Sequence, residues 1–254
     1  SNLYAIGLFN SILSNYILDC LNPSANFQKG DIDRLLYRES PSIKAKVGAL
    51  SNFCIKKRSE LLKFSLIEEQ FNQSPLYFKK GNLSDSVKQY LNFENKAYSF
   101  IIISQAIIDD LILNSFELTD QDKKDIINSQ GISLGSLPLA KEAKNEFLAS
   151  IKDEDIPENI GDFILELPEI EFLESEKQKV VEQFDSLYKD NNDLESFCNQ
   201  KRKQNPLFEN INPINVWYWF KENNIIPKQR MNDLAMEFLA NLLREILMED
   251  EDGI

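Results

Sequence analysis

The chain has 254 residues, enough for one large domain or two smaller ones, and its formal net charge is −13. It contains no histidine, which excludes the usual general base at neutral pH and the commonest zinc ligand. No apolar run approaches the roughly 18 residues of a membrane span, and no secretory signal pattern is present. Three cysteines without ligand-type spacing indicate reduced thiols. We therefore expect a cytoplasmic protein without a membrane partner.

Apolar residues at the helical period predict a mainly α fold, with several helices joined by short irregular or β-hairpin connections. The first predicted helix covers 3–21 and stops before Pro23, because proline disfavours helical geometry in the preceding residue. Pro41 follows a capping serine and opens a long helix to about residue 70. Residues 76–83 are predicted to be a hairpin or loop.

The second half of the chain is also predicted to be helical. A helix over about 84–116 contains the most apolar segment, which marks it as a central helix. Further helices are predicted over about 174–204, after the cap-and-proline pair at 212–213, and over about 228–249. We divide the chain into the end of a recognition region plus a long helix, an acidic helical domain, a linker or crossover, and a C-terminal helical region, at residues 1–75, 76–152, 153–173 and 174–254.

The charge is unevenly distributed. Residues 1–60 hold eight basic and five acidic residues, and residues 196–230 hold six and two. The stretch between them and the last 24 residues are strongly acidic. If the two basic stretches meet on one face, a nucleic-acid backbone could bind there; otherwise each is a solvated helix surface.

The segment after the first predicted helix holds the sharpest candidate site. The side-chain amides of Asn22, Asn26 and Gln28 can pair with an adenine edge, and Lys29 can contact a phosphate. The alternative is a helix cap and turn in which these amides bind the local backbone.

Basic side chains elsewhere are candidates for phosphate contact, with solvation or helix-end complementarity as the alternative. They are Lys56, Lys57, Arg58, Lys201, Arg202, Lys203, Lys221, Lys228 and Arg230. A consecutive run of aromatic residues could stack on an extruded base, although such a run more often anchors a helix in a core or interface. This aromatic cluster is Trp217, Tyr218, Trp219 and Phe220. We predict no catalytic residues and no metal site.

Residues 8–35 read LFNSILSNYILDCLNPSANFQKGDIDRL. Over residues 3–36 the chain resembles the closing part of the target-recognition region in large adenine-specific DNA methyltransferases of restriction-modification and bacteriophage-exclusion (BREX) systems. More loosely, residues 205–254 are similar to the C-terminal part of the same proteins. The chain has neither an Asn-Pro-Pro-Tyr type sequence for a flipped adenine nor a glycine-rich segment for S-adenosylmethionine.

The resemblance therefore implies a non-catalytic C-terminal segment of an adenine-N6 methyltransferase, which assists DNA recognition and braces domains. S-adenosylmethionine would be the cofactor of the parent enzyme, and this segment would bind none. The implied partners are duplex DNA, reached through the parent enzyme, and other subunits of a defence system. The alternative is an acidic helical module that binds proteins, or mimics DNA, and makes no DNA contact.

Overall fold

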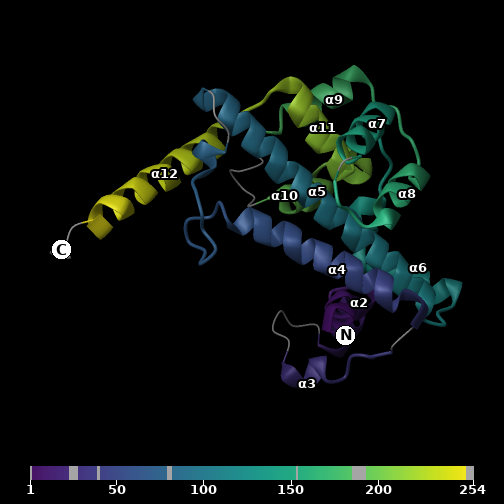
Figure 1. Ribbon diagram of the computed structural model, residues 1–254. Coiled ribbons are helices and arrows are strands. Elements are labelled where there is room, and N and C mark those ends of the chain that lie inside the picture. The colour runs from purple at the N-terminus through teal and green to yellow at the C-terminus, as the bar shows by residue number, and fades with distance from the viewer. Residues whose placement is uncertain are drawn as a thin grey trace.

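Two long helices that lie side by side form the axis of the fold: α4 (Pro41–Leu62) and α5 (Leu83–Ser115) (Figure 1). The computed structural model describes residues 2–22, 28–38, 41–78, 82–152, 154–184 and 193–249. Within these ranges the mainly α prediction is confirmed. The other helices are α1 (Asn2–Phe9), α2 (Ile12–Leu21), α3 (Lys29–Ile32), α6 (Asp120–Gln130), α7 (Lys141–Ser150), α8 (Glu158–Glu166), α9 (Glu174–Val181), α10 (Leu194–Gln204), α11 (Pro213–Asn223) and α12 (Lys228–Glu249).

Short 3₁₀ helices complete the described elements: η1 (Pro75–Tyr77), η2 (Leu134–Ser136) and η4 (Pro206–Asn210). The only β pairing within the described residues is an isolated parallel bridge between Leu139 and Glu169. The alternative of a β-hairpin over 76–83 is not found where the chain is described, since η1 occupies its start. Residues 79–81 lie outside the described ranges.

The predicted first helix is two helices, because the chain breaks at Asn10 and Ser11. The Ser11 side chain caps α2 by accepting from the Ser14 backbone N–H, and the hydroxyls of both serines donate to the Leu8 carbonyl. Serine side chains that bind nearby backbone groups compete with helical hydrogen bonds, which explains the break.

Two other predicted helices are shorter than expected. α4 ends at Leu62 rather than near residue 70, and the Asn72 backbone N–H donates to the Lys63 carbonyl at 2.8 Å, which closes a turn. The predicted helix over 174–204 is found as α9 and α10, and Asp193 caps α10 by accepting from the Ser196 backbone N–H. A capping bond thus sets the start of α10, and a closed loop follows the end of α4, whereas the apolar period alone overestimates the length of both helices.

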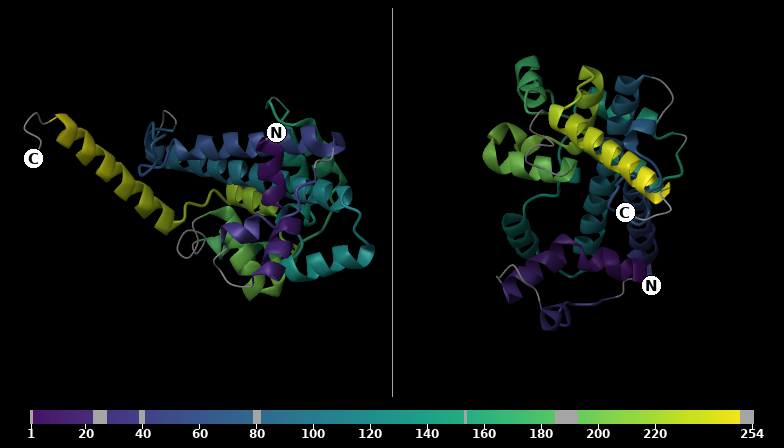
Figure 2. Two further views of the ribbon diagram at one scale, coloured as in Figure 1. Left: turned by 90° about the horizontal axis from the view of Figure 1, so that it is seen from below. Right: turned by 90° about the vertical axis from the view of Figure 1, so that its left-hand side faces the viewer.

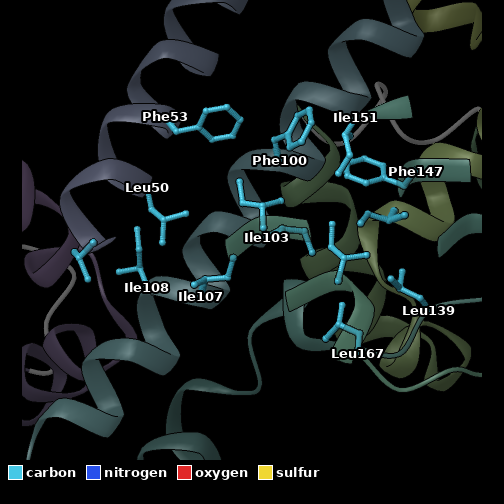
Figure 3. Packing of buried hydrophobic residues seen from close by; sticks show 14 of the residues in the cluster. Leu50, Phe53, Phe100, Ile103, Ile107, Ile108, Leu139, Phe147, Ile151 and Leu167 are labelled. Carbon is cyan, nitrogen blue, oxygen red and sulfur yellow. The ribbon is translucent and has the colours of Figure 1, made fainter. Parts of the chain in front are cut away.

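An aromatic ladder crosses the centre of the fold. Phe53 of α4 stacks edge-on against Phe100 of α5, with ring centroids 5.4 Å apart. Phe100 then contacts Phe147 of α7, which packs edge-on against Trp217 of α11; both centroid distances are 5.2 Å. Figure 3 shows Phe53, Phe100 and Phe147 among the aliphatic side chains that fill the space around them. The main core therefore draws on residues from Tyr4 to Trp217.

A second core lies along the N-terminal half of α5. Val87 and Leu91 of that helix are fully buried there, with Phe197 of α10 and Leu234 of α12. α5 is long and apolar enough to cross a membrane by length and composition alone. However, 67% of its most apolar window is buried inside the protein, as in the core helix of a soluble protein.

α12 leaves the body of the protein and projects away from it (Figure 2). Its first turns are attached: Leu234 is fully buried, and Phe238 packs against Tyr77 of η1 at a centroid distance of 5.4 Å. Its last turns extend beyond the other elements, so the helix has both a docked part and a protruding part.

Gly135 of η2 lies very close to α5, so a substitution there tests how tightly the two elements pack. A Cβ atom at Gly135 would lie 2.7 Å from the Ile102 carbonyl oxygen and 2.8 Å from the Ala106 Cβ, neither of which can turn away. We expect Gly135→Ala to destabilise the fold by about 1–3 kcal/mol. Gly161→Ala is the control: it lies within α8 with open space around it, and it should stabilise by about 0.5–1 kcal/mol.

Urea unfolding followed by circular dichroism at both positions measures this difference. Equal effects of the two substitutions would show that η2 does not pack tightly on α5.

Candidate functional site

The amide segment after α2 makes local capping contacts. The side-chain Nδ2 of Asn22 donates to Asp31 Oδ2 at 2.9 Å, and the Gln28 backbone N–H donates to the same oxygen at 2.9 Å. These two hydrogen bonds lower the pKa of Asp31 below its usual value. Gln28 and Lys29 are exposed, and Asn26 lies outside the described residues. The Asn22 side chain therefore ties the end of α2 to Asp31 of α3, and its backbone N–H donates to the Leu18 carbonyl as the C-cap of α2.

In the first basic stretch, on α4, Lys57 is held by carboxylates and aromatic rings. Its Nζ lies 3.1 Å from Glu60 and 3.8 Å from Glu154, and within 5.5 Å of the ring centroids of Phe53 and Phe100. The ammonium thus covers the end of the aromatic ladder and is opposed by two negative charges. The neighbouring Lys56 is exposed.

In the second basic stretch, the last turn of α10 carries three cations that complement the negative end of the helix. Lys201 Nζ donates to the side-chain oxygen of Gln183 at 3.1 Å, and Arg202 Nη1 donates to the Ile132 carbonyl at 2.8 Å. Lys203 is exposed. Two of the three cations therefore hold neighbouring segments in place.

The remaining basic candidates divide in the same way. Lys221 forms an ion pair with the Glu146 carboxylate of α7. Arg230 lies 2.6 Å from the Glu94 carboxylate, and the two side chains are only 15% and 8% exposed. This buried pair joins α12 to α5, and either partner alone would be an uncompensated buried charge. Lys228 is exposed.

The aromatic cluster anchors α11 in the protein. Trp217, Trp219 and Phe220 are at most 4% exposed, and only Tyr218 is half-buried. Trp219 packs edge-on against Phe172 at 5.2 Å. Three of the four rings are thus already covered by protein, so a base could not stack on them without rearrangement.

One cavity brings the two basic stretches together. It has a volume of about 800 Å³ and lies between α1, α2, α4, α5, the end of α6 and α10. Arg58 from the first stretch and Arg202 from the second both line it, and Glu195 of α10 lies 4.0 Å from the Arg58 guanidinium. Six side-chain amides also line it: Asn10, Asn15, Gln70, Gln105, Gln130 and Asn199.

Burial sets the electrostatics of this cavity. It raises the pKa of Glu195, although the nearby Arg58 guanidinium partly opposes that shift. It also raises the pKa of the Cys54 thiol to about 11, so this thiol is protonated at neutral pH and is a poor nucleophile. The described lining residues therefore offer hydrogen-bond donors and acceptors with two guanidinium groups, and the Cys54 thiol among them is not activated. Among the described residues no group of cysteine, aspartate or glutamate side chains is arranged to hold a metal ion.

Asp109 joins the wall of the cavity to the start of the chain. Its carboxylate accepts the Ile12 backbone N–H at 2.9 Å and the Gln105 side-chain amide at 3.1 Å. Ile12 is the first residue of α2, so the negative charge lies at the positive end of that helix. Burial nevertheless raises the pKa of Asp109 to about 6.

Sequence reasoning did not identify this cavity. Its amides and Asp109 come from four helices and two connecting segments, and the Asp109–Ile12 contact spans 97 positions. The local signal was a carboxylate within the very apolar segment of α5, which marks a buried polar contact without naming its partner.

No protein-family model matches this chain, and neither the curated proteins nor the solved structures contain a match to it. The site must therefore be interpreted from its own residues.

Asp109 predicts a specific pH dependence of stability. Its folded pKa of about 6 exceeds the usual 3.8, so the folded state keeps a proton that the unfolded state loses between about pH 4 and 6. The carboxyl therefore lowers stability as the pH rises through this range. Asp109→Asn keeps an acceptor for Ile12 and removes the titration. We expect its stability relative to wild type to increase by about 2–3 kcal/mol between pH 4 and pH 7.

Chemical denaturation at several pH values measures this change. Asp110→Asn is the matched control, because Asp110 is the exposed neighbour on α5. A stability difference for Asp109→Asn that does not change with pH would show that this carboxyl ionises normally in the folded protein.

Proposed function

We propose that this chain is a non-catalytic C-terminal segment of an adenine-N6 DNA methyltransferase of a restriction-modification or phage-defence system. It braces the end of the target-recognition region and assists DNA recognition. The parent enzyme uses S-adenosylmethionine and contacts duplex DNA and other subunits of the system. The observation that carries the proposal is the firm attachment of α1 and α2, the helices with the resemblance, to the α4–α5 axis.

α1 makes an unusually close contact with α4. A Cβ atom at Gly7 would lie 2.5 Å from the Val47 Cγ1 and 2.7 Å from the Ser51 Oγ, so glycine permits this approach. Tyr4 is fully buried, and its hydroxyl donates to the Arg38 carbonyl at 2.7 Å. The start of the chain is therefore packed as part of the main core.

α2 is fixed at both ends. Asp109 of α5 accepts from the first residue of α2, Ile12, and the Gln130 side chain at the end of α6 donates to Asp19 Oδ2 at 2.7 Å. A recognition element connected to α1 and α2 would thus be held in a fixed orientation relative to α4 and α5. Such bracing suits an enzyme that must position a base accurately.

The proposal is tested in the whole methyltransferase, expressed in a host free of adenine methylation. We expect the whole protein to produce N6-methyladenine at a defined DNA motif. A protein truncated before Leu3 should lose this methylation, because its recognition region loses its support. Sequencing that detects N6-methyladenine across the genome is the readout.

The truncated protein must remain folded and bind S-adenosylmethionine, which calorimetry can establish. Methylation of the same motif after truncation would refute the bracing role. Absence of methylation by the folded whole protein would refute the assignment to this enzyme class.

The second candidate is an acidic protein-binding module that makes no DNA contact. It is favoured by the ion pairs of the basic residues, since carboxylates already oppose Lys57, Arg58, Lys221 and Arg230. In that case the cations stabilise the fold, and the excess negative charge repels a phosphate backbone.

Salt dependence of DNA binding separates the two candidates. If Arg58 and Arg202, which line the cavity, contact phosphates, the chain binds a short duplex at low salt, and replacing both with alanine lowers the slope of log affinity against log salt by about 2. We expect this outcome, measured by fluorescence anisotropy. The control variant replaces the exposed Lys141 and Lys152 and should leave the slope unchanged. Absence of binding at every salt concentration would favour the protein-binding module.

A further inference from the structure

Three polar residues in the wall of the cavity contact one another: Asp109 and Gln105 of α5, and Asn10 between α1 and α2. Gln105 Nε2 donates at 3.1 Å to both Asp109 Oδ1 and the Asn10 backbone carbonyl, and Asp109 Oδ1 also accepts the Ile12 backbone N–H. Asn10 Nδ2 donates to the Ile6 carbonyl at 2.8 Å. The partners of both amide NH₂ groups are oxygens that can only accept, so the orientation of each amide is fixed.

The atoms that remain at this part of the wall are acceptors. No described residue donates to Asp109 Oδ2, Gln105 Oε1 or Asn10 Oδ1. Asp109 is only 8% exposed, and with a pKa of about 6 it is ionised at neutral pH. A carboxylate oxygen that is withdrawn from water and lacks a donor is costly. This part of the cavity therefore favours a ligand group that donates hydrogen bonds, such as an amino group.

The wall formed by α10 carries a cation without a carboxylate partner. Glu195, Asn199 and Arg202 line the cavity at helical spacing, and Glu195 lies 4.0 Å from Arg58, so these two charges oppose each other. No described carboxylate lies within ion-pair distance of Arg202, whose Nη1 donates to the Ile132 carbonyl at 2.8 Å. That bond orients the guanidinium, and its other N–H groups can bind a phosphate.

Apolar side chains complete the lining. Ile6, Ile55 and Ile132 are 43%, 44% and 49% exposed, and all three line the cavity. Uncovered isoleucine surface inside a cavity suits the faces of a flat ring. The volume of about 800 Å³ is that of a small-molecule site, so the ligand is larger than a single ion.

We propose that this cavity binds a nucleotide whose base carries an exocyclic amino group, as adenine and cytosine do. The amino group donates to Asp109 and Gln105, the ring lies against the isoleucines, and the phosphate pairs with Arg202. Carboxylates and side-chain amides are the groups with which proteins bind these amino groups. The interaction needs no duplex DNA, so it can hold or fail separately from the function proposed above.

Calorimetry on the intact chain with two matched nucleotides tests the proposal. Inosine 5′-monophosphate carries a carbonyl oxygen where adenosine 5′-monophosphate (AMP) carries its amino group. At about pH 7.5, where Asp109 is ionised, AMP should bind with a Kd below about 1 mM. The inosine nucleotide should bind at least about tenfold more weakly, because its oxygen would face acceptors. Adenosine, which lacks the phosphate, should also bind about tenfold more weakly.

Asp109→Asn tests where the base lies. The single side-chain oxygen of the variant stays bound to Ile12 and Gln105, so an NH₂ group replaces Oδ2. The variant should lose about tenfold in affinity for AMP and should prefer the inosine nucleotide, a reversal that unfolding cannot produce. Asp110→Asn is the control, because Asp110 is exposed and does not line the cavity. It should keep the preference of the wild type.

Arg202→Ala tests where the phosphate lies. It should weaken AMP binding by about tenfold and change adenosine binding by less than about twofold, since adenosine has no phosphate. Lys203→Ala, at the exposed neighbouring position, should change neither. Thermal unfolding verifies that both variants fold.

A single-stranded oligonucleotide of deoxyadenosine identifies the source of the nucleotide. Binding at least about tenfold tighter than that of AMP, with the same loss in Asp109→Asn, would assign the cavity to a nucleotide within a strand. Weaker or equal binding would assign it to a free nucleotide.

Three results would overturn the proposal. Neither AMP nor the oligonucleotide could bind at millimolar concentration. AMP and the inosine nucleotide could bind equally well, which would remove the role of the amino group. Asp109→Asn could keep the wild-type preference, which would place the base elsewhere. Absence of duplex binding would change none of these results, so the two proposals are tested separately.

Discussion

The burial of α5 on nearly all sides is the constraint on which the rest of the structure depends. One side of this helix supplies Phe100 to the aromatic ladder, and its N-terminal half supplies Val87 and Leu91 to the second core. Such a helix is insoluble alone, so elements from both ends of the chain must cover it. The few buried polar groups of α5 therefore need specific partners. The Asp109 carboxylate accepts a hydrogen bond from the Ile12 backbone N–H of α2, and the Glu94 carboxylate accepts one from Arg230.

Folding around α5 also brings many basic side chains next to carboxylates. The chain has 41 acidic and 28 basic residues, and many of the cations that sequence patterns group together are separated in space and paired with carboxylates. Lys57 lies by Glu154, and Arg58 lies by Glu195. A local cluster of basic residues is therefore a poor guide to a nucleic-acid surface in an acidic protein, because folding brings distant carboxylates to it. The cavity is the one described place where a cation from each basic stretch, Arg58 and Arg202, lines the same space.

The sequence could predict whatever depends on local physics. The cap-and-proline pair at Asn212 and Pro213 correctly places the start of α11, because the capping bond to the Ile214 backbone N–H is local. It cannot show that the same Asn212 side chain donates to the Gly135 and Leu137 carbonyls, more than 70 positions away. The cavity was unpredictable for the same reason. The apolar period also wrongly predicted one continuous helix at the start of the chain. It does not register serine side chains that compete for the backbone hydrogen bonds of a helix.

The exposed apolar side chains Leu239, Leu243 and Ile246 of α12 show that a correctly predicted helix can still have an unpredicted surface. The apolar period of residues 228–249 correctly predicted the helix α12. The period cannot distinguish apolar side chains that pack within the same chain from those that stay exposed, because it records only their spacing. The distinction comes from the tertiary structure: Leu234 is buried and Leu243 is not. Phe238 packs on Tyr77 of η1 and Leu234 packs in the second core, so contacts made by the first turns fix the direction of the whole helix.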